Sequence, residues 1–110
     1  MKIDKELLKG SNIPVILQAL SEKEMYGYEL IKHIEEKTNG IFLFKEGTLY
    51  PLLHKLESEE AVVSFWETVD GRKRKYYKLT KSGQKMLAKK KKEWAFFKGI
   101  IDTSLGGKTI

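Results

Sequence analysis

The sequence predicts a mostly α-helical α+β domain, and three observations support this fold class. Apolar residues recur with the period of an α-helix over three segments, residues 11–20, 26–37 and 46–60. The period then changes to two over residues 62–69 and 74–79, on either side of Asp70-Gly71, a dipeptide typical of tight hairpin turns. A helical pattern returns over residues 81–102. The expected order is therefore three helices, a two-stranded hairpin and one long helix.

Length and composition limit the classes of protein that this chain can belong to. With 110 residues and 41% hydrophobic residues, it suits one folded domain with a modest core. It contains no cysteine, which excludes disulfides, cysteine-based metal sites and thiol nucleophiles. No apolar run is long enough to cross a bilayer, and the charged N-terminus does not resemble a signal peptide. We expect a soluble, cytoplasmic protein with no membrane partner.

The first helical segment, residues 11–20, begins at Ser11-Asn12, whose side chains suit a helix cap. Pro14 is tolerated in its first turn. Gly10 separates this segment from Asp4 to Lys9, which can form a short amphipathic turn or a kinked extension of the helix. Residues 21–25 are expected to form a turn.

In the second segment, residues 26–37, one face is apolar, and Tyr28, Ile31 and Ile34 are expected in the core. Asn39 or Gly40 can adopt the left-handed conformation that ends a helix.

The third segment, residues 46–60, carries leucines at helical spacing and has Pro51 early enough for its first turn. Its opposite face is polar.

The long last helix, residues 81–102, is capped by Thr80 and followed by a frayed tail at Gly106-Gly107-Lys108. We divide the chain into residues 1–80 and residues 81–110, which together form one compact unit. Three helices followed by a hairpin are typical of a winged helix-turn-helix domain, in which one helix enters the major groove of DNA and the hairpin, or wing, lies beside it. The last helix would then mediate dimerisation.

Candidate DNA-binding residues lie at three places in this fold. The helix over 46–60 offers donors on its polar face, and the hairpin tip carries four consecutive cations. Backbone amides at the start of the helix over 26–37 favour a phosphate. The candidates are Tyr26, Gly27, Lys45, Thr48, Tyr50, His54, Lys55, Arg72, Lys73, Arg74 and Lys75. The alternatives are a solvated helix face, a charged hairpin that prevents edge aggregation, and a Tyr26 that packs in the core.

The charge distribution agrees with a polyanionic partner. The net charge is +6, and cations are concentrated at residues 72–75 and 89–92. Solvated surface charge is the alternative explanation.

The last helix carries an apolar stripe near heptad spacing, which predicts a dimer interface. Its members are Leu87, Trp94, Phe97 and Ile101. A twofold dimer would suit a palindromic operator. The alternative is that the helix folds back on the first two helices of its own chain.

Catalysis is not expected. His33 and His54 lie in no metal-binding or nucleophile motif, so we predict neither an enzyme nor a bound metal or cofactor.

Three ordered blocks resemble the PadR-like transcriptional regulators: Tyr26-Gly27-Tyr28-Glu29-Leu30-Ile31, residues 46–57, and residues 71–83. The single C-terminal helix is similar to the short branch of that family, which includes multidrug-responsive repressors. The resemblance implies a homodimeric repressor that dimerises through the last helix and the partner's N-terminal helix. It also implies a pore at the dimer centre that holds flat aromatic molecules, bordered by Gln18, Leu87, Lys90, Lys91, Trp94 and Lys98.

Three lysines at this implied pore distinguish the chain from members that bind cationic drugs. Lys90, Lys91 and Lys98 would repel a cation and favour an anionic aromatic effector. Gly10 and Pro14 interrupt the first helix and alter the expected shape of the pore. The alternatives to a DNA-binding repressor are a small-molecule sensing or sequestering protein and a protein-interaction adaptor, both without a DNA role.

Overall fold

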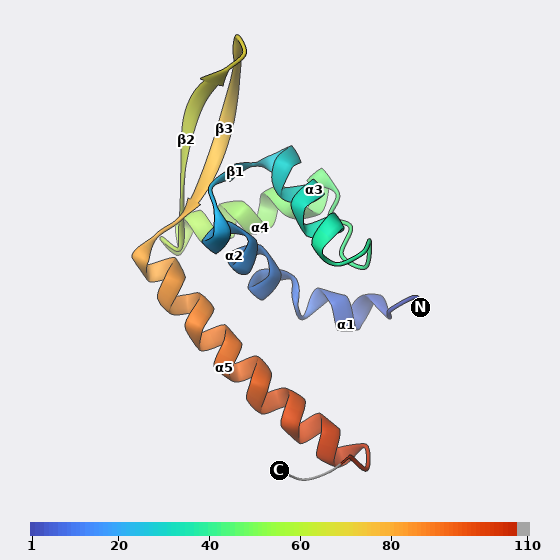
Figure 1. Ribbon diagram of the computed structural model, residues 1–110. Coiled ribbons are helices and arrows are strands. Elements are labelled where there is room, and N and C mark those ends of the chain that lie inside the picture. Colours follow the sequence, from blue (N-terminus) through green and yellow to red (C-terminus); the bar gives the residue numbers. More distant parts are fainter. Residues whose placement is uncertain (108–110) are drawn as a thin grey trace.

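The computed structural model describes residues 1–107, so Lys108 of the predicted tail lies outside the described residues. Within these residues, five helices and three strands follow one another (Figure 1). Their bounds are α1 Lys5–Lys9, α2 Asn12–Glu22, β1 Met25–Tyr26, α3 Gly27–Lys37, α4 Glu46–Ser58, β2 Val62–Val69, β3 Arg72–Leu79 and α5 Lys81–Ser104. The mostly helical α+β fold class is confirmed.

The helices follow the predicted segments with local differences. Gly10 separates α1 from α2, and Ser11 occupies the cap position of α2 without forming a side-chain capping hydrogen bond. Pro51 lies in the second turn of α4, so the prediction of a first-turn position was wrong. At the start of α5, the Thr80 hydroxyl accepts a hydrogen bond from the Gly83 amide at 2.9 Å, as predicted.

Two expectations about exposed segments were wrong. Tyr28 is 58% exposed instead of buried, because its position on α3 points away from the helices that cover Leu30 and Ile34. Gly106 and Gly107 do not fray: their amides donate to the carbonyl oxygens of Thr103 and Asp102, at 3.1 and 2.6 Å. The positive φ of Gly106, +87°, allows this turn to close the end of α5.

A third strand completes the sheet. Residues 21–25 were expected to form a turn, but α2 continues to Glu22 and Met25–Tyr26 form β1. The sheet is antiparallel in the order β1-β3-β2, with Tyr26 opposite Tyr76. A two-residue strand is too short to show any periodicity, so only its partner β3 reveals it.

Residues with positive φ lie at the predicted turns. Asn39 and Gly40 have φ of 52° and 80° after α3, and Asp70 and Gly71 have φ of 52° and 77° between β2 and β3. Two successive positive φ values match the right-handed twist of the hairpin strands, which explains why Asp-Gly occurs there.

The core lies between α2, α3, α4 and the base of the sheet. Its fully buried members include Ile16, Leu17, Met25, Leu30, Leu49, Leu53, Leu56, Val62 and Tyr77. From this core the β2–β3 hairpin and α5 project in different directions (Figure 1). The radius of gyration is 15.7 Å, larger than the roughly 13 Å of a compact domain of this length. The hairpin and α5 therefore extend beyond the compact core.

Candidate nucleic-acid interface

The outer face of α4 is polar and accessible. Leu49, Leu53 and Leu56 anchor the helix in the core with no exposed surface, which fixes the direction of its opposite face. The predicted DNA-binding residues that lie exposed here are Lys45, Thr48, His54 and Lys55. An α-helix anchored in this way can enter a major groove with its polar side chains toward the bases.

Tyr50 does not share this outer face, because it packs against the start of α3. A Cβ atom added at Gly27 would lie 2.1 Å from the Tyr50 hydroxyl oxygen, so only glycine admits this contact. Burial raises the pKa of Tyr50, with a further contribution from the charge of Glu46. The close packing of Tyr50 against Gly27 brings α4 into direct contact with the start of α3.

The four predicted cations of the hairpin form two pairs that differ in exposure and in contacts with aromatic rings. Arg72 and Lys73 are exposed next to the turn. The Arg74 guanidinium carbon lies 4.4 Å from the centre of the Tyr26 ring, and Lys75 Nζ lies 5.8 Å from the centre of the Tyr77 ring. Cation–π contacts of this kind hold the second pair against the base of the wing.

Aromatic side chains stiffen the base of the wing. Tyr76 on β3 stacks on Phe65 with ring centres 5.7 Å apart, and meets the edge of Tyr26 at 5.5 Å. Tyr26 is half-buried at the cap position of α3, without a side-chain capping hydrogen bond. The start of α3 and the wing are thus joined through one aromatic cluster.

A cavity of about 840 Å³ lies between α1, α2, the end of α3 and α5. Five of the six residues predicted to border a pore line it: Gln18, Leu87, Lys90, Lys91 and Trp94. Lys98 does not line it, although the preceding residue Phe97 does. The Lys98 Nζ lies 3.0 Å from the Asp102 carboxylate on the same helix.

The predicted dimer stripe on α5 is buried at one end and exposed at the other. Leu87 is 7% exposed because the proximal half of α5 packs on α2, whereas Trp94, Phe97 and Ile101 are 52%, 49% and 37% exposed. The distal half of the stripe is therefore only partly covered by residues 1–107.

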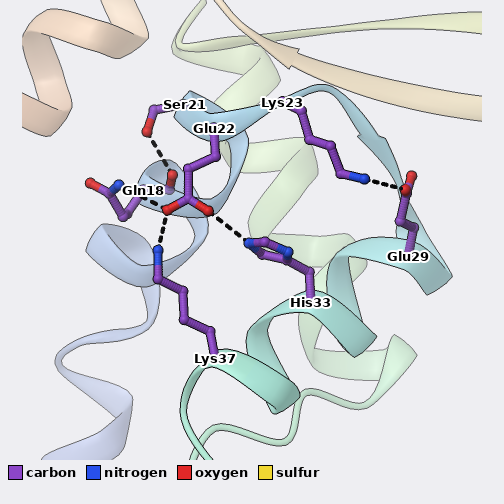
Figure 2. Close-up of polar contacts among 7 residues, drawn as sticks. All are labelled: Gln18, Ser21, Glu22, Lys23, Glu29, His33 and Lys37. Atoms are coloured by element: carbon purple, nitrogen blue, oxygen red, sulfur yellow. Dashed lines mark hydrogen bonds and ion pairs between the residues drawn. The ribbon is translucent and has the colours of Figure 1, made fainter.

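A polar cluster that the sequence analysis missed joins α2 to α3 (Figure 2). The Glu22 carboxylate accepts a hydrogen bond from Gln18 Nε2 at 3.1 Å, contacts Lys37 Nζ, and lies 2.8 Å from His33 Nε2. These hydrogen bonds, that of Lys37 first and that of Gln18 second, lower the pKa of Glu22 to about 2. The available signal was the spacing of four residues between Gln18 and Glu22 and again between His33 and Lys37, which aligns each pair on one helix face.

The described residues 1–107 include no group of three or more His, Asp or Glu side chains arranged to hold a metal ion. Within the same part of the chain, no helix is both long and apolar enough to cross a membrane.

Comparison with known proteins identifies the family. The model of the PadR-like transcriptional regulator family matches residues 16–89, which span α2 through the proximal half of α5. The chain belongs to this family. PadR-like proteins are regulators of transcription, so this membership confirms the winged helix-turn-helix prediction and the prediction that the chain is not an enzyme.

Individual relatives agree with the family. A PadR-like regulator of Bacillus cereus has a TM-score of 0.81 and 31% identity, over 94% of this chain and 100% of that one. A transcriptional regulator of Clostridium thermocellum has a TM-score of 0.83 and 32% identity, over 90% of this chain and 97% of the other. The chain is also similar to transcriptional regulator Rv3488 of Mycobacterium tuberculosis, with 36% identity over 66% of this chain and 64% of the relative.

Proposed function

We propose that this PadR-like chain is a cytoplasmic homodimeric repressor that binds a palindromic operator in double-stranded DNA. In this proposal α4 enters the major groove, with Thr48 and His54 toward the bases and Lys45 and Lys55 toward the phosphates. The wing lies on the adjacent backbone or in the minor groove, where Arg72 supplies the main charge.

The observation that carries this proposal is the placement of the free cations. Arg72 and Lys73 remain exposed at the wing tip, while the neighbouring pair, Arg74 and Lys75, is held on aromatic rings. The exposed polar face of α4 belongs to the same winged domain, and a stiff wing beside a helix suits the spacing of major groove and backbone.

The decisive experiment measures binding to a duplex that the wild-type protein selects from a random pool. Arg72→Ala should weaken binding to selected and unrelated duplexes alike and should reduce the salt slope by about one. Thr48→Ala should weaken binding to the selected duplex only. The control is Lys92→Ala, which removes the same charge from an exposed position on α5 outside the proposed interface. An Arg72→Ala protein with the wild-type slope would contradict the wing contact.

Dimerisation is proposed through the distal half of α5. The exposure of Trp94, Phe97 and Ile101 supports this role, because large apolar side chains gathered on one helix are typical of an interface. A twofold axis through α5 would place two copies of α4 on one face of a palindromic site.

The cavity is proposed to hold a small aromatic, anionic effector. Lys90 and Lys91 supply positive charge beside the indole of Trp94 and the apolar wall of Leu87. Binding would favour a spacing of the two α4 helices that does not match the operator and so would release the DNA. A protein that only sensed or sequestered ligands would quench Trp94 fluorescence on binding but would show no salt-dependent affinity for a duplex.

A further inference from the structure

The cluster of polar side chains around Glu22, which we call the Glu22 cluster, joins α2 to α3 beside the cavity. Gln18 and Glu22 belong to α2, whereas His33 and Lys37 belong to α3, and all four side chains meet at one carboxylate (Figure 2). Two of these residues, Gln18 and Lys37, also line the cavity. The cluster is therefore in contact with the space in which we propose an effector binds.

Gln18, which lines the cavity, has one amide atom without a hydrogen-bond partner among the described residues. Its amide nitrogen donates to Glu22, while its amide oxygen is buried and has no hydrogen-bond partner within the part of the chain that the structure describes. Figure 2 shows this oxygen turned away from Glu22. A buried oxygen without a donor is unfavourable, so a ligand that carries an N–H or O–H group would gain by reaching it.

The other end of α3 sets the position of α4. Gly27, at the start of the helix, packs against the Tyr50 hydroxyl so closely that a methyl group would not fit. Because α3 is a single helix of 11 residues, a shift of its last turn at Lys37 is carried to its first turn at Gly27. Tyr50, and with it α4, responds to the same movement.

We propose that Glu22 is a positioning residue that couples the cavity to α4. A ligand that donates to the Gln18 oxygen and competes for Lys37 loosens the attachment of α3 to Glu22, and the changed position of α3 alters the presentation of α4 to DNA. This coupling rests on the proposed function, since it requires an effector in the cavity and DNA on α4. In this proposal α3 has two positions, and both the ligand in the cavity and the DNA on α4 favour one of them over the other.

The test measures the coupling directly with 1-anilinonaphthalene-8-sulfonate, an aromatic anion that carries one N–H donor. The dissociation constant for the selected duplex is determined with and without saturating probe, and the ratio of the two constants reports the coupling. In the wild type we expect the probe to raise the constant at least tenfold. In Glu22→Gln the ratio should fall below threefold, while probe affinity and duplex affinity in the absence of probe each change less than threefold.

The matched control is Glu29→Gln. Glu29 forms an ion pair with Lys23 at 2.9 Å, which also links α3 to the segment before it, but neither residue lines the cavity. This variant should keep the wild-type ratio. His33→Ala, at a residue that contacts Glu22 but does not line the cavity, provides a second way to weaken the cluster if Glu22→Gln does not fold.

The results of this test distinguish failure of the Glu22 coupling role from failure of the proposed function. A Glu22→Gln protein that keeps the wild-type ratio would overturn the coupling role, as would a wild-type protein whose duplex affinity does not respond to bound probe or whose cavity does not bind the probe. Failure of the wild type to bind any duplex would instead overturn the proposed function, and the coupling with it. Loss of coupling in both cluster variants and in the Glu29→Gln control would show a general structural effect and would overturn the specific role of Glu22.

Discussion

The two helices α4 and α5 both carry an apolar stripe, but only one stripe is covered by its own chain. On α4, Leu49, Leu53 and Leu56 have no exposed surface. On the distal half of α5, Trp94 and Phe97 are about half exposed, at 52% and 49%. Both stripes consist of apolar residues at helical spacing. Their exposure differs because the fold packs other elements against α4 but not fully against the distal half of α5.

This difference separates two roles. The buried face of α4 fixes the direction of its polar face, which is what a helix that contacts DNA requires. The proximal half of α5 is similarly attached, since Gly83 and Leu87 are buried, but its distal half extends away from the core (Figure 1). The chain thus covers the apolar face of α4 by itself and leaves the apolar face of the distal half of α5 partly exposed.

The largest effect is expected for Leu53→Ala on α4. Removing a fully buried leucine leaves a cavity and should lower the free energy of unfolding by about 3 kcal/mol. Urea unfolding measures this loss. His54→Ala, on the exposed side of the same helix, is the control and should change stability by less than about 0.5 kcal/mol. Equal effects of the two changes would contradict the description of α4 as a helix with one buried face.

Phe97→Ala should act mainly on assembly. Aromatic residues at the centre of an interface contribute about 2 kcal/mol or more, so we expect the dimer dissociation constant to rise at least about thirtyfold. Analytical ultracentrifugation over a range of protein concentrations measures it, with Lys92→Ala as the control. If the wild type is monomeric at micromolar concentration, the distal half of α5 has some other role.

Two glycines of α5 offer a comparison within one helix. A Cβ atom at Gly83 would lie 2.1 Å from the backbone carbonyl oxygen of Ala61, so Gly83→Ala should cost about 2 kcal/mol. At Gly99 nothing lies within 4 Å, and Gly99→Ala should stabilise the helix by about 0.5 to 1 kcal/mol. Thermal unfolding measures both. A destabilising Gly99→Ala would indicate that the partner chain approaches the helix backbone at this glycine.

A comparably small effect, confined to acidic pH, is expected from the Glu22 cluster. Its pKa of about 2 lies below the ordinary value of 4.5, so the ionised carboxylate stabilises the fold above pH 4.5, and this contribution is lost as the pH falls toward 2. Because the side chain is 31% exposed, solvent screening reduces the contribution to about 1 kcal/mol. Urea unfolding at pH 6 and pH 3 should show a smaller difference for Glu22→Gln than for the wild type. An identical pH dependence would mean that the cluster adds nothing to stability.

Local sequence signals predicted the elements that depend on local physics. The leucine spacing of α4, the Asp70-Gly71 turn and the Thr80 cap all appear in the structure, because each is set by backbone geometry within a few residues. The position of Tyr28 and the strand β1 were not predicted, since burial and strand pairing depend on segments far away in the chain.

By itself, therefore, the sequence determined the order of the elements and the composition of the polar and apolar faces. Only the tertiary structure decided which cations remain free, since Arg74 meets Tyr26 only when β3 pairs with β1. It also brought Gln18, Glu22, His33 and Lys37 together across two helices and set Gly27 against Tyr50. The physical reason is that periodicity reports which face of an element is apolar, whereas the partner of that face is chosen by the packing of the whole chain.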